Sequence, residues 1–198
     1  MALGAVIVAG ALAIAGGAQA ALVQIIGPEA NGTFAGNDCG AGGFSDCYAT
    51  QTGTQQGAPT NPALLGSAAV YKRDSVNNQP TGSEDFGTGI PNTFGTRFTI
   101  SYNGATNEIS FSYAPQAGDP ILHYFSVKQS DGFVLFYDAS PIIGATVDLD
   151  TYFPNNPGWS HITFFNGGTV PAPEPASLAL FGAGLLGLAL HRRRRPTG

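Results

Sequence analysis

Charged residues are scarce in this sequence, and basic ones are scarcer still. Of its 198 residues 11% are charged, with 13 Asp and Glu against 8 Lys and Arg. Four of the basic residues are the arginines at 192–195, so residues 21–173 hold 12 acidic and four basic residues, a net charge of −8. This acidity argues against a protein that binds nucleic acid or an anionic surface.

Cysteine is also nearly absent, and the two residues present, Cys39 and Cys47, lie in a glycine-rich stretch. A close pair in an oxidising compartment usually forms a disulfide, and a loop this short gives a stabilisation of about 2–3 kcal/mol. The alternative is a metal site. No histidine lies nearby, however, and two thiolates under-fill the tetrahedral shell of zinc. We therefore expect a disulfide and no metal.

No catalytic motif is apparent between residues 21 and 173. The Gly-x-Ser-x-Gly turn is missing, and His161 begins a predicted strand, where a structural hydrogen bond is the ordinary role. Adjacent acids at 84–85, or Asp148 with Asp150, could serve a secreted hydrolase, although sequence neighbours say nothing about spacing across a cleft. Asp148 and Asp150 could also donate oxygens to a structural calcium ion. We expect no enzyme activity and no cofactor, and keep these two alternatives open.

Alternating apolar and polar residues predict an all-β fold. The clearest pair is 97–102 and 108–113, joined by Asn-Gly-Ala-Thr-Asn, which predicts a β-hairpin with one buried face. A second hairpin is predicted at 121–128 and 133–137. Further strands are predicted at 22–26, 68–73, 145–149 and 161–165. No internal repeat or long helical periodicity is present, and these short strands predict an antiparallel sandwich or jelly roll over residues 21–165.

The remaining parts of this region are predicted to be irregular. Residues 31–66 are poor in apolar side chains, so we expect long loops there, held by the disulfide. Residues 166–175 form the expected linker to the C-terminal segment.

Trp159 is the only tryptophan and lies in a loop rich in proline and asparagine, near Tyr152. Sandwich modules bind sugars by stacking aromatic rings on pyranose faces, so both residues are candidate carbohydrate contacts. The other interpretation is that Trp159 closes the end of the sandwich as a buried plug.

The N-terminal residues predict a secretory signal peptide. Residues 2–17 are apolar and uncharged, and Ala18-Gln19-Ala20 is the small-x-small pattern that a signal peptidase accepts. We expect cleavage after Ala20, which makes 1–20 the signal peptide. No lysine or arginine precedes the apolar run, so Met1 need not be the true start.

The C-terminal residues form a three-part segment. Pro171-Ala172-Pro173-Glu174-Pro175 is stiff, because three prolines fix the backbone φ and restrict the residues before them. An uncharged run follows at 176–190, predicted to be a hydrophobic transmembrane helix. Its core of 14 residues would span about 21 Å as a helix, short of a hydrocarbon core of about 30 Å. The basic tail at 191–198 includes Arg192, Arg193, Arg194 and Arg195, which are expected to stay on the cytoplasmic side as a membrane stop.

This segment resembles the PEP-CTERM sorting signal of Gram-negative bacteria, with the motif Pro173, Glu174 and Pro175, the apolar run and the arginine cluster in order. The resemblance implies that a membrane-embedded enzyme, exosortase, recognises the motif and removes the tail. An ordinary C-terminal anchor is the alternative. Residues 118–166 also resemble a group of PEP-CTERM exoproteins of unknown activity, in the phrases at 119–121, 127–128, 156–158 and 160–164.

The sequence thus predicts an exported bacterial surface or extracellular-matrix protein, structural or adhesive in role. Its expected partners are signal peptidase, exosortase and, transiently, the inner membrane, with exopolysaccharide as a further candidate. A carbohydrate-binding module for exopolysaccharide is the main alternative function, and a secreted hydrolase is the second.

Overall fold

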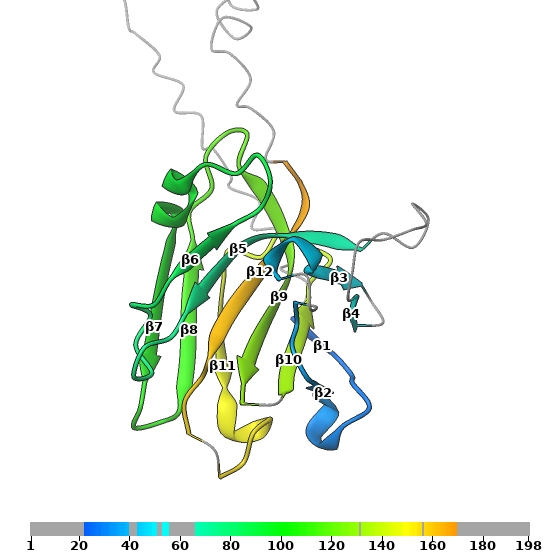
Figure 1. Cartoon of the computed structure of the whole chain (residues 1–198), viewed down its shortest axis with the longest axis vertical. Helices are drawn as coiled ribbons and strands as arrows, with labels where there is room; N and C mark the ends of the chain where they lie inside the picture. Colours follow the sequence, from blue (N-terminus) through cyan, green and yellow to red (C-terminus); the bar gives the residue numbers. More distant parts are fainter. Residues whose placement is uncertain are drawn as a thin grey trace, which may run out of the picture.

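A computed structural model describes residues 22–39, 43–50, 53–55, 66–130, 132–155 and 157–169 of the chain. They form two antiparallel sheets (Figure 1). The larger sheet contains β1 (Val23–Ile25), β2 (Phe34–Ala35), β3 (Tyr48–Thr50), β4 (Gly53–Gln55), β5 (Ser67–Asp74), β6 (Glu84–Phe86), β9 (Pro120–Gln129), β10 (Gly132–Tyr137) and β12 (His161–Thr169). The smaller sheet contains β7 (Phe98–Asn103), β8 (Glu108–Tyr113) and β11 (Gly144–Asp148). Short 3₁₀ turns connect them: η1 (Ala30–Gly32), η2 (Phe44–Asp46), η4 (Asn92–Arg97) and η5 (Leu149–Thr151).

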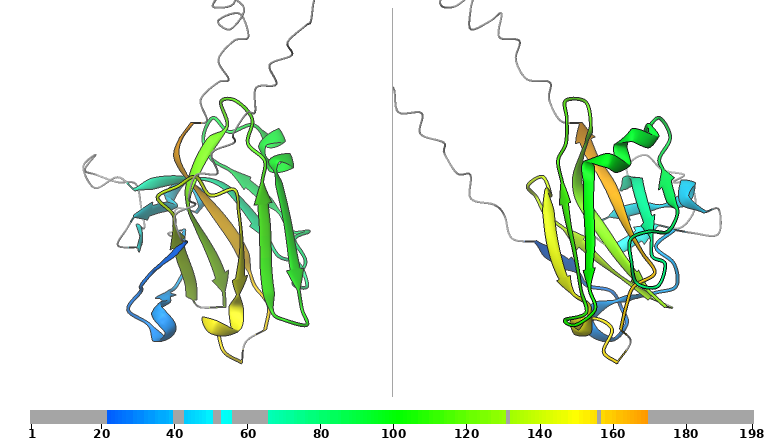
Figure 2. Two further views of the ribbon diagram at one scale, coloured as in Figure 1. Left: turned by 180° about the vertical axis from the view of Figure 1, so that it is seen from behind. Right: turned by 90° about the vertical axis from the view of Figure 1, so that its left-hand side faces the viewer.

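The strand order confirms the predicted all-β fold. The larger sheet runs β1-β10-β9-β12-β5-β3-β4, with β2 also on β10 and β6 also on β5, and the smaller runs β11-β8-β7. Figure 2 shows the smaller sheet lying over one face of the larger. Both predicted hairpins are present, as the antiparallel pairs β7–β8 and β9–β10. Within the described part of the chain, no helix has the length and hydrophobicity needed to cross a membrane.

Two sequence predictions about irregular segments were wrong. The linker was expected to begin at Asn166, but β12 continues to Thr169, which pairs with Pro120 of β9. Two glycines at 167 and 168 concealed this extension, because glycine has low strand propensity. Residues 31–66 were expected to be loops, but they contain β2, β3 and β4. These strands are two or three residues long, too short for an alternating pattern to reveal them.

The main core lies between the two sheets. Phe164 of β12 is fully buried, and its ring centre lies 4.8 Å from that of Phe111 in the smaller sheet. Phe98 of β7 packs on the same ring at 4.5 Å, and Phe125 of β9 contacts Phe111 at 4.9 Å. Alternation therefore places every second side chain of β7, β8 and β12 toward this core.

A second apolar cluster covers the opposite face of the larger sheet. Phe133, Leu135 and Phe165 point away from the main core and are at most 2% exposed. The chain from β2 to β3 packs over them and includes Phe34, whose ring stacks on Phe133 at 5.1 Å. The central strands are therefore buried on both faces, which explains why their sequences are almost continuously apolar.

Candidate functional site

The disulfide between Cys39 and Cys47 lies within the segment that covers this second face. Their Cα atoms are 4.3 Å apart, and both residues are at most 4% exposed. The predicted cysteine pairing is therefore present in the structure. Its immediate neighbour Asp38 is 0% exposed, a position that acidic residues rarely occupy unless they are paired.

Asp38 is the centre of a buried polar network. Its Oδ1 lies 2.6 Å from Nε2 of His161, and its Oδ2 accepts hydrogen bonds from Ser126 Oγ at 2.5 Å and Thr163 Oγ1 at 2.8 Å. Ser126 and Thr163 are fully buried, and His161 is 7% exposed. The other ring nitrogen of His161 faces Asp74 at 3.9 Å.

Strand register brings the partners of Asp38 together. His161 and Thr163 are two residues apart on β12, so they point to the same face of the sheet. Ser126 of β9 lies directly opposite Thr163 in the antiparallel pairing. Three polar side chains thus converge on one point, and the segment around the disulfide supplies the carboxylate that they require.

The electrostatics of the network keep Asp38 ionised at neutral pH. Burial alone would raise the pKa of this carboxyl, but the hydrogen bond and charge of His161, with the two hydroxyl donors, lower the pKa below its usual value overall. A nucleophilic triad requires a serine hydroxyl that faces an imidazole base. Here Ser126 and His161 both bind the same carboxylate, so the arrangement is that of a structural clamp.

Trp159 is buried, in the position of a plug. It is 5% exposed, and its Nε1 donates a hydrogen bond to the carbonyl oxygen of Asn78 at 3.0 Å. Tyr152 is half-buried, with its ring edge against Phe136 at a centroid distance of 5.5 Å. A ring with so little exposure offers no face on which a sugar could stack, so this geometry speaks against a Trp159–Tyr152 carbohydrate site.

The acids considered for calcium or hydrolysis have local partners. Asp148 accepts hydrogen bonds from the backbone N–H of Asp150 and from the Thr151 hydroxyl. Asp150 accepts a hydrogen bond from Asn107 at 2.6 Å. Neither has further acidic, histidine or cysteine neighbours sufficient for a metal cluster among the described residues.

The other acidic pair, Glu84 and Asp85, is likewise engaged. Arg73 binds Glu84 at 2.6 Å, and Lys72 binds Asp85 at 2.9 Å. The hydroxyl of Tyr71 also donates to Glu84. The two carboxylates are thus directed to different cations on β5 and do not face each other.

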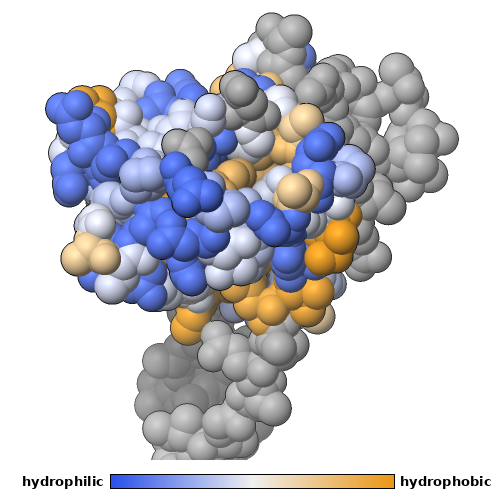
Figure 3. Space-filling model, turned by 90° about the horizontal axis from the view of Figure 1, so that it is seen from below, coloured by the Kyte–Doolittle hydropathy of each residue, from blue (hydrophilic) through white to orange (hydrophobic). Residues whose placement is uncertain are grey.

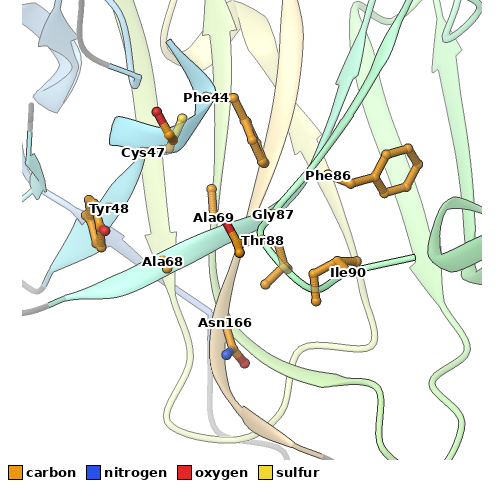
Figure 4. Close-up of a pocket in the computed structure, with 12 residues that line it drawn as sticks. Phe44, Cys47, Tyr48, Ala68, Ala69, Phe86, Gly87, Thr88, Ile90 and Asn166 are labelled. Carbon is orange, nitrogen blue, oxygen red and sulfur yellow. The ribbon is translucent and has the colours of Figure 1, made fainter. Parts of the chain in front are cut away.

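A groove of about 400 Å³ opens where β12 separates from β5 (Figure 4). The last paired residues there are Phe165 and Ala69, after which β12 continues on β9 alone. Figure 4 shows the Phe44 ring and Asn166 at the two ends of the groove, with Ala69 and Thr88 between them. Its lining residues are uncharged: Phe44, Ser45, Cys47, Tyr48, Ala68, Ala69, Val70, Phe86, Gly87, Thr88, Ile90 and Asn166.

Sequence reasoning missed both Asp38 and this groove. The one feature that marks Asp38 in the sequence is its position beside Cys39. That position does not predict burial, because Asp46, which adjoins the other cysteine, is only half-buried. The groove residues come from segments far apart in the sequence, and no spacing rule connects them. The other sequence-predicted sites lie outside the described residues: the signal peptide 1–20, the motif 173–175, the apolar run 176–190 and the arginines 192–195.

Comparison with known proteins supports the prediction for the C-terminus. Residues 171–195 match the family described as the PEP-CTERM protein-sorting motif. The chain therefore carries a PEP-CTERM sorting motif, which marks an exported protein that is transiently anchored in the membrane and sorted by exosortase. No curated protein and no solved structure matches, so the expected likeness of residues 118–166 to other PEP-CTERM exoproteins is unsupported.

Proposed function

We propose that this chain is a non-enzymatic surface or extracellular-matrix protein, which exosortase releases from its membrane tail and which has a structural or adhesive role. The observation that carries the proposal is a sorting motif attached to a β-sandwich. The burial of the polar residues most suited to catalysis, Asp38 and His161, also favours a structural role. Their hydrogen bonds are satisfied within the fold.

Glu174 provides the test of sorting. It is the one carboxylate in the motif, so Glu174→Ala should leave the protein uncleaved in the inner membrane. The matched control is Glu29→Ala, which removes an exposed carboxylate directly before η1 and should be processed like the parent chain. Gel mobility and fractionation of native cells measure the result. Unchanged cleavage of Glu174→Ala would refute recognition by exosortase.

A second candidate function is binding of exopolysaccharide, and the groove at Phe44 is the observation that favours it. Small-ligand pockets usually enclose about 300–1,000 Å³ and combine apolar walls with a few polar groups. The groove has aromatic residues Phe44 and Tyr48, hydroxyls and the Asn166 amide, and no charged lining residue. This composition suits an uncharged saccharide better than an ionic ligand.

The groove can be tested with variants that preserve its bulk. Phe44→Leu removes the aromatic face but keeps an apolar side chain, and Thr88→Val removes a hydroxyl at nearly constant volume. Both should reduce retention of the mature protein by the host's own exopolysaccharide in a pull-down. Ile143→Ala, an exposed apolar residue on another loop, is the control and should be retained normally. Equal retention of all three variants would exclude the groove as the binding site.

A further inference from the structure

The two ends of the sandwich differ sharply in charge. At the end where β12 finishes, the described loops 87–97, 114–120 and 138–143 contain three charged residues. Arg97 and Asp119 form an ion pair at 3.1 Å, and Asp138 is only 5% exposed. We call this surface the tail-side end. Its other residues are uncharged: alanine, glycine, proline, polar residues and a few larger apolar residues, of which Ile143 is 53% exposed.

The opposite end, which we call the far end, is acidic. Glu29, Glu108, Asp148 and Asp150 lie in or beside its loops, and none of them forms an ion pair within the part of the chain that the structure describes. Lys128 also lies there, with its ammonium group donating to the carbonyl oxygens of Gly36 and Ser130. Figure 3, which views the molecule from this end, shows a mainly hydrophilic surface.

Both described ends of the chain point to the tail-side end. Val23 of β1, Tyr137, Tyr124 and Phe165 of β12 form one row across four adjacent strands. Three strand spacings of about 4.8 Å place the outer two about 14 Å apart. From this row β12 continues upwards to Thr169, and β1 begins at it (Figure 1). The two segments expected to enter the membrane are therefore attached on the same side of the domain.

The connection to the sorting motif is short. Three residues separate Thr169 from Pro173, so the two Cα atoms are at most about 14 Å apart even in a fully extended chain. The apolar run begins at 176, at most about 25 Å from Thr169 by the same arithmetic. An enzyme embedded in the membrane cannot reach the motif at this distance without meeting the folded domain.

We propose that the tail-side end is a contact surface for the membrane-embedded enzyme that processes the tail, and that the acidic far end faces away from the membrane. This inference rests on the proposed exosortase processing. Docking an unpaired charge against a membrane-embedded protein would cost its hydration and expose it to anionic headgroups. The tail-side end avoids this cost, because the exposed residues of its described loops are uncharged and the half-buried Arg97–Asp119 pair is neutral as a whole.

The experiment introduces charge at one end or the other. Ala117 and Ala139 are exposed at the tail-side end, and Ala30 and Ala105 are exposed at the far end. We expect the double variant Ala117→Glu/Ala139→Glu to be processed at least about tenfold more slowly in a pulse–chase in the native host. The matched control Ala30→Glu/Ala105→Glu should be processed at the parent rate.

A flexible linker distinguishes a lost docking contact from a misfolded domain. Insertion of about 15 Gly/Ser residues after Thr169 adds roughly 20 Å of mean reach and frees the motif from the domain. Both double variants carrying the linker should then be processed at the same rate, whereas a misfolded domain would stay slow. The proposal is overturned if the two double variants slow processing equally, or if Ala117→Glu/Ala139→Glu does not slow it. It is also overturned if Ala117→Glu/Ala139→Glu still slows processing when the linker is present.

The Glu174→Ala chain distinguishes this inference from the function on which it rests. If Glu174→Ala is still cleaved, exosortase processing itself is wrong. If Glu174→Ala is blocked while the tail-side variants are processed normally, only the docking surface is wrong.

Discussion

Removal of the Asp38 carboxylate is the perturbation for which the structure gives the sharpest expectation. Asp38→Ala deletes the acceptor of three buried donors, those of Ser126, Thr163 and His161. Loss of a buried charged group from its hydrogen-bond network typically costs about 3–5 kcal/mol, because the remaining donors stay desolvated without an acceptor. A domain of this size has a total stability of about 5–15 kcal/mol, so the variant should lose a large fraction of it.

The assay is urea unfolding of the mature domain at pH 7, with thermal unfolding as a second measure. A loss of about 3–5 kcal/mol corresponds to a decrease in Tm of roughly 6–20 °C. Glu29→Ala, which removes an exposed carboxylate, should change the free energy of unfolding by less than about 0.5 kcal/mol. Ser126→Ala removes one of the three donors, so its loss of unfolding free energy should lie between those of Asp38→Ala and Glu29→Ala.

The pH dependence of the same comparison provides a second check. The pKa of Asp38 is lowered in the folded state relative to its ordinary value of 3.8, so its stabilisation is fully present above that value. It is lost as the pH falls below 3.8 through the folded-state pKa. The difference in stability between parent and Asp38→Ala should therefore shrink in this acidic range. The structural role of Asp38 would be refuted if the unfolding free energies of parent and Asp38→Ala differed by less than about 1 kcal/mol at pH 7. It would also be refuted if their difference did not change on acidification.

Three further predictions concern the disulfide and the loop around Trp159. Reduction of Cys39–Cys47 should lower the free energy of unfolding by about 2–3 kcal/mol, seen as a lower urea midpoint with dithiothreitol, and an unchanged midpoint would contradict it. Trp159→Ala should lower the free energy of unfolding by about 3–5 kcal/mol. Trp159→Phe, which loses the hydrogen bond to Asn78, should lower it by about 1–2 kcal/mol. A variant that keeps its stability and loses only polysaccharide retention would restore the sugar-contact interpretation. Gly158→Ala should cost about 1–3 kcal/mol, because φ is 103° and a Cβ would lie 2.2 Å from the Asn78 side-chain oxygen. Gly89→Ala, with φ 79° and open space around it, should cost less, and equal losses in thermal unfolding would count against the steric argument.

Sequence alone identified the secondary structure wherever alternation is regular. The pattern in 108–113 predicted β8 with its observed bounds, and the pattern in 161–165 found the start of β12. Alternation reports burial on one face, so it succeeds where a strand is long enough to show a period of two. It fails for β2, β3 and β4, whose two or three residues acquire their conformation from a partner strand.

The signal peptide and the C-terminal sorting segment are also recognised from contiguous residues. Pro173, Glu174, Pro175 and the arginines form a contiguous pattern, which is why the PEP-CTERM motif could be recognised without a structure and is matched at 171–195. The short tether after Thr169, in contrast, became apparent only when β12 was seen to extend past Phe165.

Composition and local pattern determined that this chain is a weakly charged β-protein with a sorting tail. Tertiary structure decided what the individual polar residues do. Asp38 lies 123 positions from His161, and only the pairing of β9 with β12 places Ser126 and Thr163 beside that carboxylate. The same holds for the separation of acidic and uncharged ends, because antiparallel strands return distant loops to a common end and thereby sort charges that are dispersed along the sequence.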